Sequence, residues 1–427
     1  MHKERIAIVQ GIRTPFCKGG GLLNEMLADD LGAFIVRELL ARVPCKGTEV
    51  DHLIVANVLQ PVHATNIARV IGVKAGLPIG VPAFTVNRNC ASGLEAVAQA
   101  MDQIRLGRSQ VVIAGGVESM SNFPVLVQKK TKEFLMRLSK ARSFKERLSI
   151  LMTFRLHMLV PDFPQIADPL CGLSMGQTAE NLSREFLVTR EEQDKFALMS
   201  HHRANEAIKS GRFAEEIVPI PLPPQYQKFQ SDDDGSRADQ TLEQLAKLKP
   251  VFDPLTGSVT AGNSSPITDG AAALLLASEE RVKQWGVKPI GYITDSASAA
   301  LAPSRMGLGP VFATAKLLQQ TGLKLSDFDL IEINEAFAAQ VIAVKKAFAS
   351  DSFAQKELNL PKAIGEIDPA KLNVNGGAIA LGHPLGASGT RLVLTMLLEL
   401  KKRGLKRGLV TLCIGGGQGE AAVVEVV

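Results

Sequence analysis

The chain has 427 residues, and its 46% apolar and 21% charged residues are typical of a globular protein of two or three domains with a large core. The longest apolar run covers only residues 271–277, which excludes a helix that crosses a bilayer. The net charge of +5 is concentrated in one short segment, which argues against a general nucleic-acid-binding protein.

The N-terminus enters an apolar strand pattern at residues 6–9, which leaves no room for a signal or transit peptide. We therefore expect a cytoplasmic protein, with a mitochondrial location as the alternative if a presequence has been removed. The cysteines form no CxxC pair and no zinc spacing, so we expect reduced thiols and no metal site. They are Cys17, Cys45, Cys90, Cys171 and Cys413.

Four segments recur in the same order in the two halves of the chain. Residues 50–57 resemble 328–334, residues 84–90 resemble 372–377, residues 111–116 resemble 409–415, and residues 269–278 resemble 419–427. Each resembles a strand, and apolar residues with helical spacing follow at 91–106 and 387–403. Strands that alternate with helices predict an α/β protein with mostly parallel sheets and helices packed on their faces.

The two halves differ by one long insertion. In the second half the strand at 409–413 is followed almost directly by the last strand, whereas about 150 residues separate the equivalent strands of the first half. We therefore predict an N-terminal half from residues 1–117 and 269–278, an inserted loop domain at 118–268, and a C-terminal half at 279–427.

The insertion carries a basic amphipathic segment at about residues 129–160. It holds nine Lys and Arg residues against two acids up to His157. Apolar residues recur at three-, four- or seven-residue steps, which predicts a helical hairpin with one apolar face: Phe134, Leu138, Ala141, Leu148, Leu151, Leu156 and Leu159. The basic residues between them are predicted to contact an anionic membrane or a partner subunit, and are Lys130, Arg137, Lys140, Lys145 and Arg147. The alternative is a solvated cover whose apolar face packs on its own core.

Cys90 lies at the junction of a strand and a helix, in the sequence NRNCASG at residues 87–93. The unpaired N–H groups and the positive dipole end of a helix N-terminus would lower the pKa of the thiol and favour the thiolate. Gly93 would allow a substrate or a backbone segment to approach closely. The alternative is a small apolar side chain in the core.

Cys413 ends the matching strand of the second half, in the sequence TLCIGGGQG at residues 411–419. Four glycines around a strand end leave backbone N–H groups open, as an oxyanion site requires. A dinucleotide-binding loop is the alternative, but here the glycines lead into a strand and not into a helix.

His383 alone among seven histidines is framed by glycine and proline in a turn, in GHPLGASG at residues 382–389. Asn334 ends another second-half strand, where a helix cap is the alternative role. His201 and His202 fall in a helical stretch, where a solvated or packed role is favoured over metal binding. Because open α/β sheets place their sites at strand ends, two cysteines, one histidine and one asparagine there suit carbon–carbon bond chemistry on a thioester.

These blocks resemble the active-site blocks of the thiolases: NCASG, NEAFA, GHPLGASG and CIGGGQG, in that order and over the whole chain. The resemblance implies a thiolase-like fold, with two βαβαβαββ halves in a layered α-β-α-β-α body and a loop domain. It also implies a homodimer or a dimer of dimers, and cleavage of 3-ketoacyl-CoA by free coenzyme A, which is a substrate, so that no cofactor is expected.

Block by block, the resemblance makes Cys90 the nucleophile, activated by His383. His383 and a water on Asn334 would stabilise one oxyanion, and the backbone N–H groups of Cys90 and Gly415 another. Cys413 would protonate the departing acetyl-CoA enolate.

Ser265 matches a position that contacts coenzyme A, and Met175 belongs to the same expected site. Here Ser174-Met175 replaces the His-Met pair of short-chain biosynthetic thiolases, which leaves room for longer acyl chains. The basic insertion resembles the β-subunit of the fatty-acid oxidation trifunctional complexes, whose α-subunit supplies hydratase and dehydrogenase activities. It also allows peripheral contact with the inner membrane. The alternatives are a ketoacyl-synthase-type condensing enzyme, which the second cysteine disfavours, and a non-catalytic lipid-binding protein.

Overall fold

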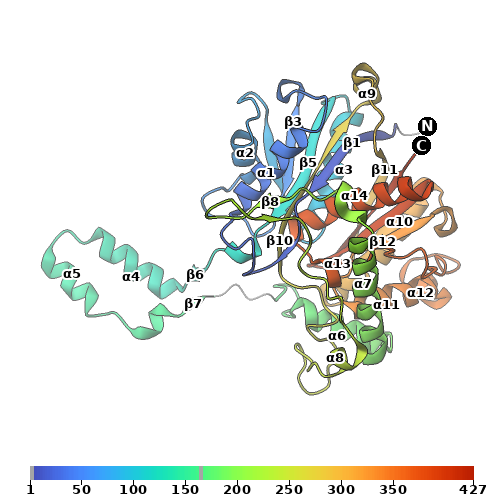
Figure 1. Cartoon of the computed structure of the whole chain (residues 1–427). Helices are drawn as coiled ribbons and strands as arrows, with labels where there is room; N and C mark the ends of the chain where they lie inside the picture. Colours follow the sequence, from blue (N-terminus) through green and yellow to red (C-terminus); the bar gives the residue numbers. More distant parts are fainter. Residues whose placement is uncertain (1–3, 163–166) are drawn as a thin grey trace.

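A computed structural model describes residues 4–162 and 167–427 (Figure 1). Its main sheet has the strand order β12-β13-β14-β11-β1-β10-β5-β3-β4, with β2 paired to β10. The strands are β1 (Ile6–Arg13), β2 (Cys17–Lys18), β3 (His52–Ala56), β4 (Ala83–Val86), β5 (Val111–Glu118), β10 (Thr268–Ala277), β11 (Gly291–Ala300), β12 (Leu330–Ile333), β13 (Arg407–Ile414) and β14 (Gln418–Glu425).

The predicted repeat is visible in the strand order. The first half runs β4-β3-β5-β10-β1 and the second β12-β13-β14-β11, with a single bridge between Leu372 and Ile331 where the equivalent of β4 would lie. The halves meet where β1 pairs antiparallel with β11. The prediction of mostly parallel sheets is wrong: among the described strands of the main sheet, β3-β4, β3-β5 and β12-β13 pair in parallel, and the other six pairs are antiparallel. Three glycines join β13 to β14, and so short a turn permits only antiparallel pairing.

Helices form three layers around the two halves of the sheet. On the outer face of the first half lie α1 (Ala28–Leu40) and α2 (Ile67–Lys74), and on that of the second lie α10 (Gly309–Thr321) and α11 (Ala338–Phe348). Between the halves, α3 (Ser92–Arg105) and α14 (Leu385–Arg403) share one core with strands of both. This is the predicted α-β-α-β-α layering.

Glycines let α3 and α14 cross with their backbones in contact. A Cβ atom at Gly93 would lie 2.5 Å from the Gly386 carbonyl oxygen, and one at Gly389 would lie 2.2 Å from the Leu94 nitrogen. Neither fits without displacing a helix, so the crossing depends on the missing side chains. The crossing fixes the start of α3 beside the start of α14, and with them the turns that carry Cys90 and His383.

The inserted segment covers the second half with α6 (Met175–Glu185), α7 (Arg190–Lys209) and α8 (Leu242–Ala246). A buried ionic cluster ties it to β1. The guanidinium of Arg13 binds both carboxylate oxygens of Asp233 at 2.6 and 2.8 Å, and Glu216 at 2.8 Å, with the Arg13 side chain fully buried.

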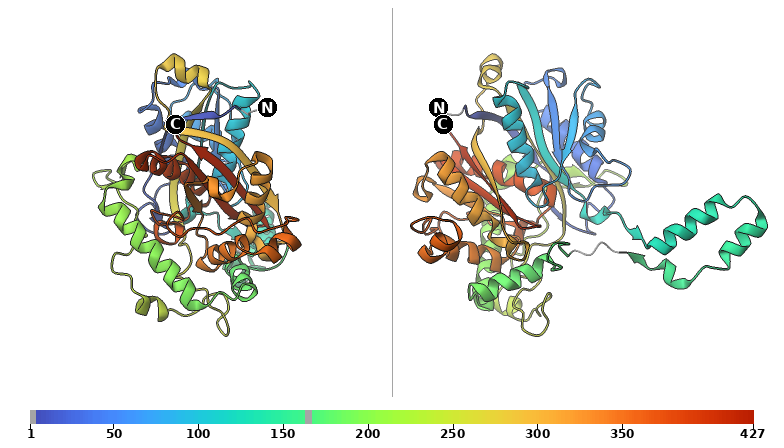
Figure 2. Two further views of the ribbon diagram at one scale, coloured as in Figure 1. Left: turned by 90° about the vertical axis from the view of Figure 1, so that its right-hand side faces the viewer. Right: turned by 180° about the vertical axis from the view of Figure 1, so that it is seen from behind.

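A helical arm, residues 126–162, stands out from the body (Figure 2). It consists of β6 (Leu126–Val127), α4 (Lys129–Lys140), α5 (Phe144–Leu151), the 3-10 turn η3 (Leu156–Leu159) and β7 (Pro161–Asp162). The predicted helical hairpin is confirmed, but the prediction of one apolar face is wrong. Phe134 and Ala141 are buried with Ile150 in a small core of the arm itself, packed by Leu138. The other predicted face residues are at least half exposed: Leu148, Leu151, Leu156 and Leu159.

The remaining helices and strands are short. They are η1 (Gly47–Glu49), η2 (Met120–Asn122), η4 (Arg212–Glu215), β8 (Ile220–Pro221), β9 (Phe229–Gln230), α9 (Glu279–Trp285), η5 (Pro303–Leu308), η6 (Leu325–Asp327), α12 (Asp351–Glu357) and α13 (Ala378–Leu381). Across the described ranges, we find no helix with the length and apolarity needed to span a membrane.

Candidate active site

Cys90 occupies the predicted turn between β4 and α3. The turn is tight, because Asn89 has a positive φ of 45° and Arg88 bridges to Cys90. The Ser92 hydroxyl locks it, accepting a hydrogen bond from the Arg88 N–H and donating one to the Asn89 carbonyl, both at 2.7 Å. The sulfur is thereby held at the start of α3, in a residue that is partly exposed although the sulfur itself is buried.

The predicted thiolate at Cys90 is wrong for the free protein. Burial of the sulfur raises the pKa of the Cys90 thiol above its ordinary value. The N–H groups of Gly415 and of Cys90 itself point to the sulfur and lower this pKa, but they offset burial only in part, and the charge of Glu118 opposes them. A neighbouring base is therefore needed to remove the proton. The N–H groups of Cys90 and Gly415 are the two that were expected to form an oxyanion site, and in this structure they point to the sulfur.

Cys413 lies near the end of β13 and is fully buried. Burial raises the pKa of the Cys413 thiol strongly, and the charge of Cys90 adds to the effect. The Asn89 amide donates to the Gly415 carbonyl at 2.8 Å and joins the two cysteine turns. The glycine turn leads into β14, as predicted, so it is not a dinucleotide-binding loop.

His383 is held in the turn between α13 and α14. Its backbone N–H donates to the Thr268 hydroxyl at 3.1 Å, and Gly382 has a φ of +104° that favours glycine. Burial and the positive charge of Arg391 lower the pKa of the His383 imidazole to about 3. The ring is therefore neutral at physiological pH and able to accept a proton.

The partners of His383 select one tautomer. Ser388 Oγ lies 2.6 Å from His383 Nδ1 and 2.9 Å from the Pro384 carbonyl oxygen. A carbonyl only accepts, so the single hydroxyl hydrogen goes to Pro384 and Ser388 accepts from His383 Nδ1–H. The lone pair then lies on Nε2, 3.3 Å from Asn334 Nδ2.

Asn334 is not a helix cap. The helix that follows, α11, has Phe337 at its N-cap position and no side-chain cap. Asn334 is buried after β12, its N–H donates to the Thr411 carbonyl at 3.0 Å, and within the described residues its Oδ1 has no hydrogen-bond partner. An unpaired buried oxygen beside the imidazole fits a water or a substrate group at this position.

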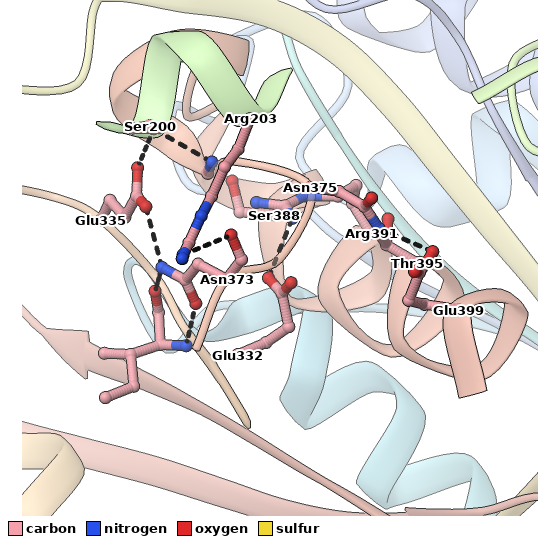
Figure 3. A network of polar contacts seen from close by, with 12 residues as sticks. Ser200, Arg203, Glu332, Glu335, Asn373, Asn375, Ser388, Arg391, Thr395 and Glu399 are labelled. Carbon is pink, nitrogen blue, oxygen red and sulfur yellow. Dashed lines mark hydrogen bonds and ion pairs between the residues drawn. The ribbon is translucent and has the colours of Figure 1, made fainter. Parts of the chain in front are cut away.

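A buried polar network that includes Ser200, Glu335 and Asn373 lies at the end of β12 (Figure 3). The Glu335 carboxylate accepts from the Ser200 hydroxyl at 2.6 Å and from the Asn373 amide at 2.8 Å. The Asn373 side chain also accepts from the N–H and donates to the carbonyl of Ile333, both at 2.9 Å, and Ile333 is the residue before Asn334. The network therefore ties the end of β12, the loop before α13 and α7 of the inserted segment together.

An apolar wall surrounds Cys413 and was not predicted. It consists of Phe252, Met306 and Phe337 together with Met175. Met175 was predicted as a substrate contact and Phe337 lies inside NEAFA, whereas Phe252 and Met306 come from segments without a recognisable pattern. Such a wall lowers the local polarity around the sulfur, which is one reason that the pKa of Cys413 is raised.

Met175 lies beside the glycine turn, since a Cβ atom at Gly415 would be 3.2 Å from its sulfur. Ser174 caps α6: its hydroxyl accepts from the Gln177 backbone N–H at 3.3 Å, and the Gln177 side-chain oxygen accepts from the Ser174 backbone N–H at 2.9 Å. The Ser265 N–H donates to the Ala336 carbonyl at 3.0 Å in the NEAFA segment, and Ser265 is partly exposed. Two predicted contact positions thus flank the predicted catalytic blocks.

The predicted basic contacts lie elsewhere. All are exposed on the arm, and among the described residues none is in an ion pair: Lys130, Arg137, Lys140, Lys145 and Arg147. His201 is buried in α7 and accepts from the Arg237 N–H, the packed role that was favoured. Over residues 4–162 and 167–427, no His, Cys, Asp or Glu cluster is arranged to hold a metal ion.

Two family profiles match successive parts of the chain. Residues 6–280 match the profile "Thiolase, N-terminal domain" and residues 287–426 match "Thiolase, C-terminal domain". The chain is 44% identical over 423 residues to the 3-ketoacyl-CoA thiolase of Pseudoalteromonas translucida (strain TAC 125), covering 99% of this chain and 97% of the relative. It is 42% identical over 424 residues to that of Yersinia enterocolitica, with the same coverage.

Solved structures with the same fold carry related names. The Bacillus anthracis acetyl-CoA acetyltransferase superposes with a TM-score of 0.85 at 37% identity, over 100% of both chains. Human mitochondrial 3-ketoacyl-CoA thiolase superposes with a TM-score of 0.85 at 36% identity, also over 100% of both chains. With two cysteines, a neutral histidine and an asparagine at the strand ends of this fold, the chain belongs to the thiolase family of acyltransferases.

Proposed function

We propose that the protein is a 3-ketoacyl-CoA thiolase, which cleaves its substrate with free coenzyme A to acetyl-CoA and a shortened acyl-CoA. The observation that carries the proposal is the convergence of two thiols on one glycine turn. The Cys90 sulfur accepts a hydrogen bond from the Gly415 N–H, and Cys413 lies two residues before Gly415, near the end of β13. One sulfur can become acylated while the other moves a proton on carbon.

In the proposed reaction, Nε2 of His383 takes the Cys90 proton and the sulfur attacks the ketone carbon. The N–H groups of Cys90 and Gly415 stabilise the oxyanion that forms. The bond between C2 and C3 then breaks, and its electron pair passes to the acetyl-CoA enolate, which takes the Cys413 proton. The coenzyme A thiol next gives its proton to the Cys413 thiolate and attacks the Cys90 thioester, and His383 and a water on Asn334 stabilise that oxyanion. The bond to the Cys90 sulfur then breaks, the shortened acyl-CoA leaves, and the sulfur regains its proton from His383.

A covalent intermediate on Cys90 tests the proposal. Incubation with a 3-ketoacyl-CoA in the absence of free coenzyme A, followed by peptide mass spectrometry, is expected to locate the acyl group on Cys90. Cys45, a buried core thiol, serves as the internal control and should carry none. An acyl group on a different cysteine, or no thiolysis by the wild-type protein, would exclude this mechanism.

The substrate contacts belong to the same proposal. Ser265 would contact the pantetheine chain and Met175 would border the acyl group, and the reaction would need no cofactor. Because Ser174 caps a helix where short-chain thiolases have histidine, we expect longer acyl chains to be accepted. Thiolysis rates across 3-ketoacyl-CoAs of increasing length measure this preference.

The biological setting is also a proposal. The 42–44% identity to bacterial 3-ketoacyl-CoA thiolases and the added arm support a role in fatty-acid β-oxidation as the β-subunit of a trifunctional complex, in the cytoplasm. The protein would be a homodimer or a dimer of dimers. The division into halves at residues 1–117 with 269–278 and 279–427, with a loop domain at 118–268, stands as part of this proposal.

The arm is the proposed contact with an anionic membrane or with the partner subunit. Its exposed basic residues stand beside exposed apolar ones, among them Phe144 at 80% and Met152 at 75% exposure. Each basic residue near an anionic surface contributes about 1 kcal/mol. Co-sedimentation with anionic vesicles at low and high salt tests the membrane role. Binding should be lost when Lys140, Lys145 and Arg147 are changed to Glu; equal binding by the wild type and this variant would refute it.

A further inference from the structure

Glu118, the last residue of β5, is a fully buried carboxylate that the proposed reaction does not use. Four N–H groups donate to it. Oε1 accepts from the Asn57 amide at 3.0 Å and the Leu59 backbone at 2.9 Å, and Oε2 accepts from the backbones of Val58 at 3.1 Å and Gly386 at 2.9 Å. This fills the four lone-pair positions of an ionised carboxylate.

The donors come from separate parts of the fold. Asn57, Val58 and Leu59 follow β3, whereas Gly386 lies 268 residues away from Glu118 in sequence, in the first turn of α14. Only the ionised carboxylate suits all four donors, because a protonated oxygen would direct its own hydrogen against an N–H. Glu118 thus joins the first half of the molecule to the start of α14.

The joined point lies next to the catalytic groups. Gly386 follows His383 by three residues and precedes Ser388, which orients the imidazole, by two. The charge of Glu118 also acts on the Cys90 sulfur. The same turn is pressed against the first half, because a Cβ atom at Gly116 would lie 1.9 Å from the Gly386 carbonyl oxygen.

We propose that Glu118 is a positioning residue for the thiolase reaction: its ionised carboxylate holds the first turn of α14, and with it His383, in register with the Cys90 turn. The inference rests on the proposed function and adds a residue to it. Glu118 touches no reacting atom in this scheme and acts through the backbone of Gly386.

If the ionised Glu118 carboxylate holds the turn, turnover depends on pH, whereas a residue that only fills space gives no such dependence. Burial raises the pKa of Glu118 to about 7, and the hydrogen bonds from Leu59, Gly386 and Val58 offset burial in part. Two titratable groups face Glu118. One is Asp269 on β10, whose negative charge raises the pKa of Glu118, and the other is the Cys90 thiol. As the pH falls through about 7, Glu118 takes up a proton, loses acceptor sites and releases the turn. Turnover should therefore fall on the acid side.

Glu118→Gln tests the inference. Its NH₂ group must face two N–H donors in either orientation, so two of the four hydrogen bonds are lost. We expect kcat to fall by about 10²-fold, as for small misplacements of catalytic groups, with KM little changed and the acid limb near pH 7 absent. Glu118→Asp keeps the charge and should retain the limb.

Asp51→Asn is the matched control. Asp51 Oδ2 accepts the N–H groups of Gln110 and Val111, at 2.6 and 2.9 Å, at the opposite end of β5. One oxygen takes both bonds, so asparagine preserves them and turnover should stay at the wild-type level.

The outcomes separate the two proposals. A wild-type protein without thiolysis would overturn the proposed function itself. If the wild type is active, a Glu118→Gln variant with wild-type kcat, or one that loses activity but keeps the acid limb, would overturn the role of Glu118. Should that variant fail to fold, Asp269→Asn decides, because removing its charge should move the limb to lower pH. No such shift, or no limb in the wild type, would overturn the inference.

Discussion

The buried imidazole and thiol place the active-site proton on sulfur in the free protein. The pKa of His383 lies near 3 and that of Cys90 above its ordinary value, so a preformed thiolate–imidazolium pair is not favoured. Proton transfer must accompany the attack on substrate, where the N–H groups of Cys90 and Gly415 stabilise the developing charge.

Alkylation of Cys90 by iodoacetamide reports this protonation state. Because only the thiolate reacts, the rate should rise with pH with a midpoint above that of an ordinary thiol, about 8.5. Mass spectrometry of the Cys90 peptide measures the rate, and the partly exposed Cys171 in the same sample is the comparison. A high, flat rate between pH 5 and 7, which an ion pair gives, would contradict the prediction.

Ser388→Ala should release the imidazole from its single tautomer. The hydroxyl that accepts from Nδ1 is lost, so the lone pair is no longer confined to Nε2, and kcat should fall by up to about 10²-fold. Nitrogen-15 NMR of the His383 ring reads the tautomer directly. Thr395 lies on the same helix as Ser388, and its hydroxyl donates to the Glu216 carboxylate, so Thr395→Val is the control. An unchanged Nδ1–H signal in Ser388→Ala would reject the assignment.

Cys413→Ala should separate the two half-reactions. Thiolysis needs a proton for the acetyl carbon and should fall by about 10²–10⁴-fold, the usual contribution of one acid or base group. Acylation of Cys90 by a simple acyl-CoA involves no carbon acid and should persist. Cys45→Ala controls for loss of a buried thiol. Near-normal thiolysis by Cys413→Ala would show that this sulfur only packs.

Catalytic residues could be predicted from the sequence where the residues next to them in the chain form a recognisable motif. Cys90, Cys413 and His383 each lie in a short glycine-rich turn, and the structure places them at the predicted strand–helix and strand–strand junctions. Glu118 could not be assigned its partners, since a hydrogen bond across 268 residues leaves no local pattern. The raised pKa of Cys90 was missed for a related reason, because burial depends on what packs from elsewhere.

At the scale of elements, the repeat predicted which segments form strands but not how they pair. Period and apolarity identify a strand, whereas its direction follows from the connection. The sheets were therefore wrongly expected to be mostly parallel, although a turn as short as the one between β13 and β14 imposes antiparallel pairing. The arm shows the same limit. Spacing predicted its helices, but Phe134 of α4 and Ala141 at its C-terminal end pack with Ile150 of α5 across a short turn, and the single face is divided.

The arm should be dispensable for stability. Its buried residues form a cluster of their own, packed by Phe154 and Met158, apart from the cores of the body. Replacing residues 126–162 with a short Gly-Ser linker should leave the melting temperature and the thiolysis rate unchanged, and should remove vesicle binding. Calorimetry and steady-state kinetics check this. A marked loss of melting temperature would mean that the arm supports the body.

Across the whole molecule, the ionic cluster at Arg13 joins the inserted segment to the central sheet. Arg13→Met leaves Asp233 and Glu216 buried without their partner, and should lower the free energy of unfolding by about 3–5 kcal/mol. Arg5→Met breaks an exposed pair with Glu279 and should cost only about 0–1 kcal/mol. Chemical denaturation measures both. If both variants lose the same free energy of unfolding, the cluster does not stabilise the junction between the inserted segment and the sheet.

The crossing of α3 and α14 limits how this sequence can drift. At Gly93, Gly116, Gly386 and Gly389 even one methyl group would meet backbone atoms closer than 3 Å. A saturating mutational scan scored by growth on a long-chain fatty acid should therefore rank these four positions with the catalytic cysteines, although none bears a reactive group. Family alignments would show them as invariant, and a search that equates invariance with catalysis would misassign them.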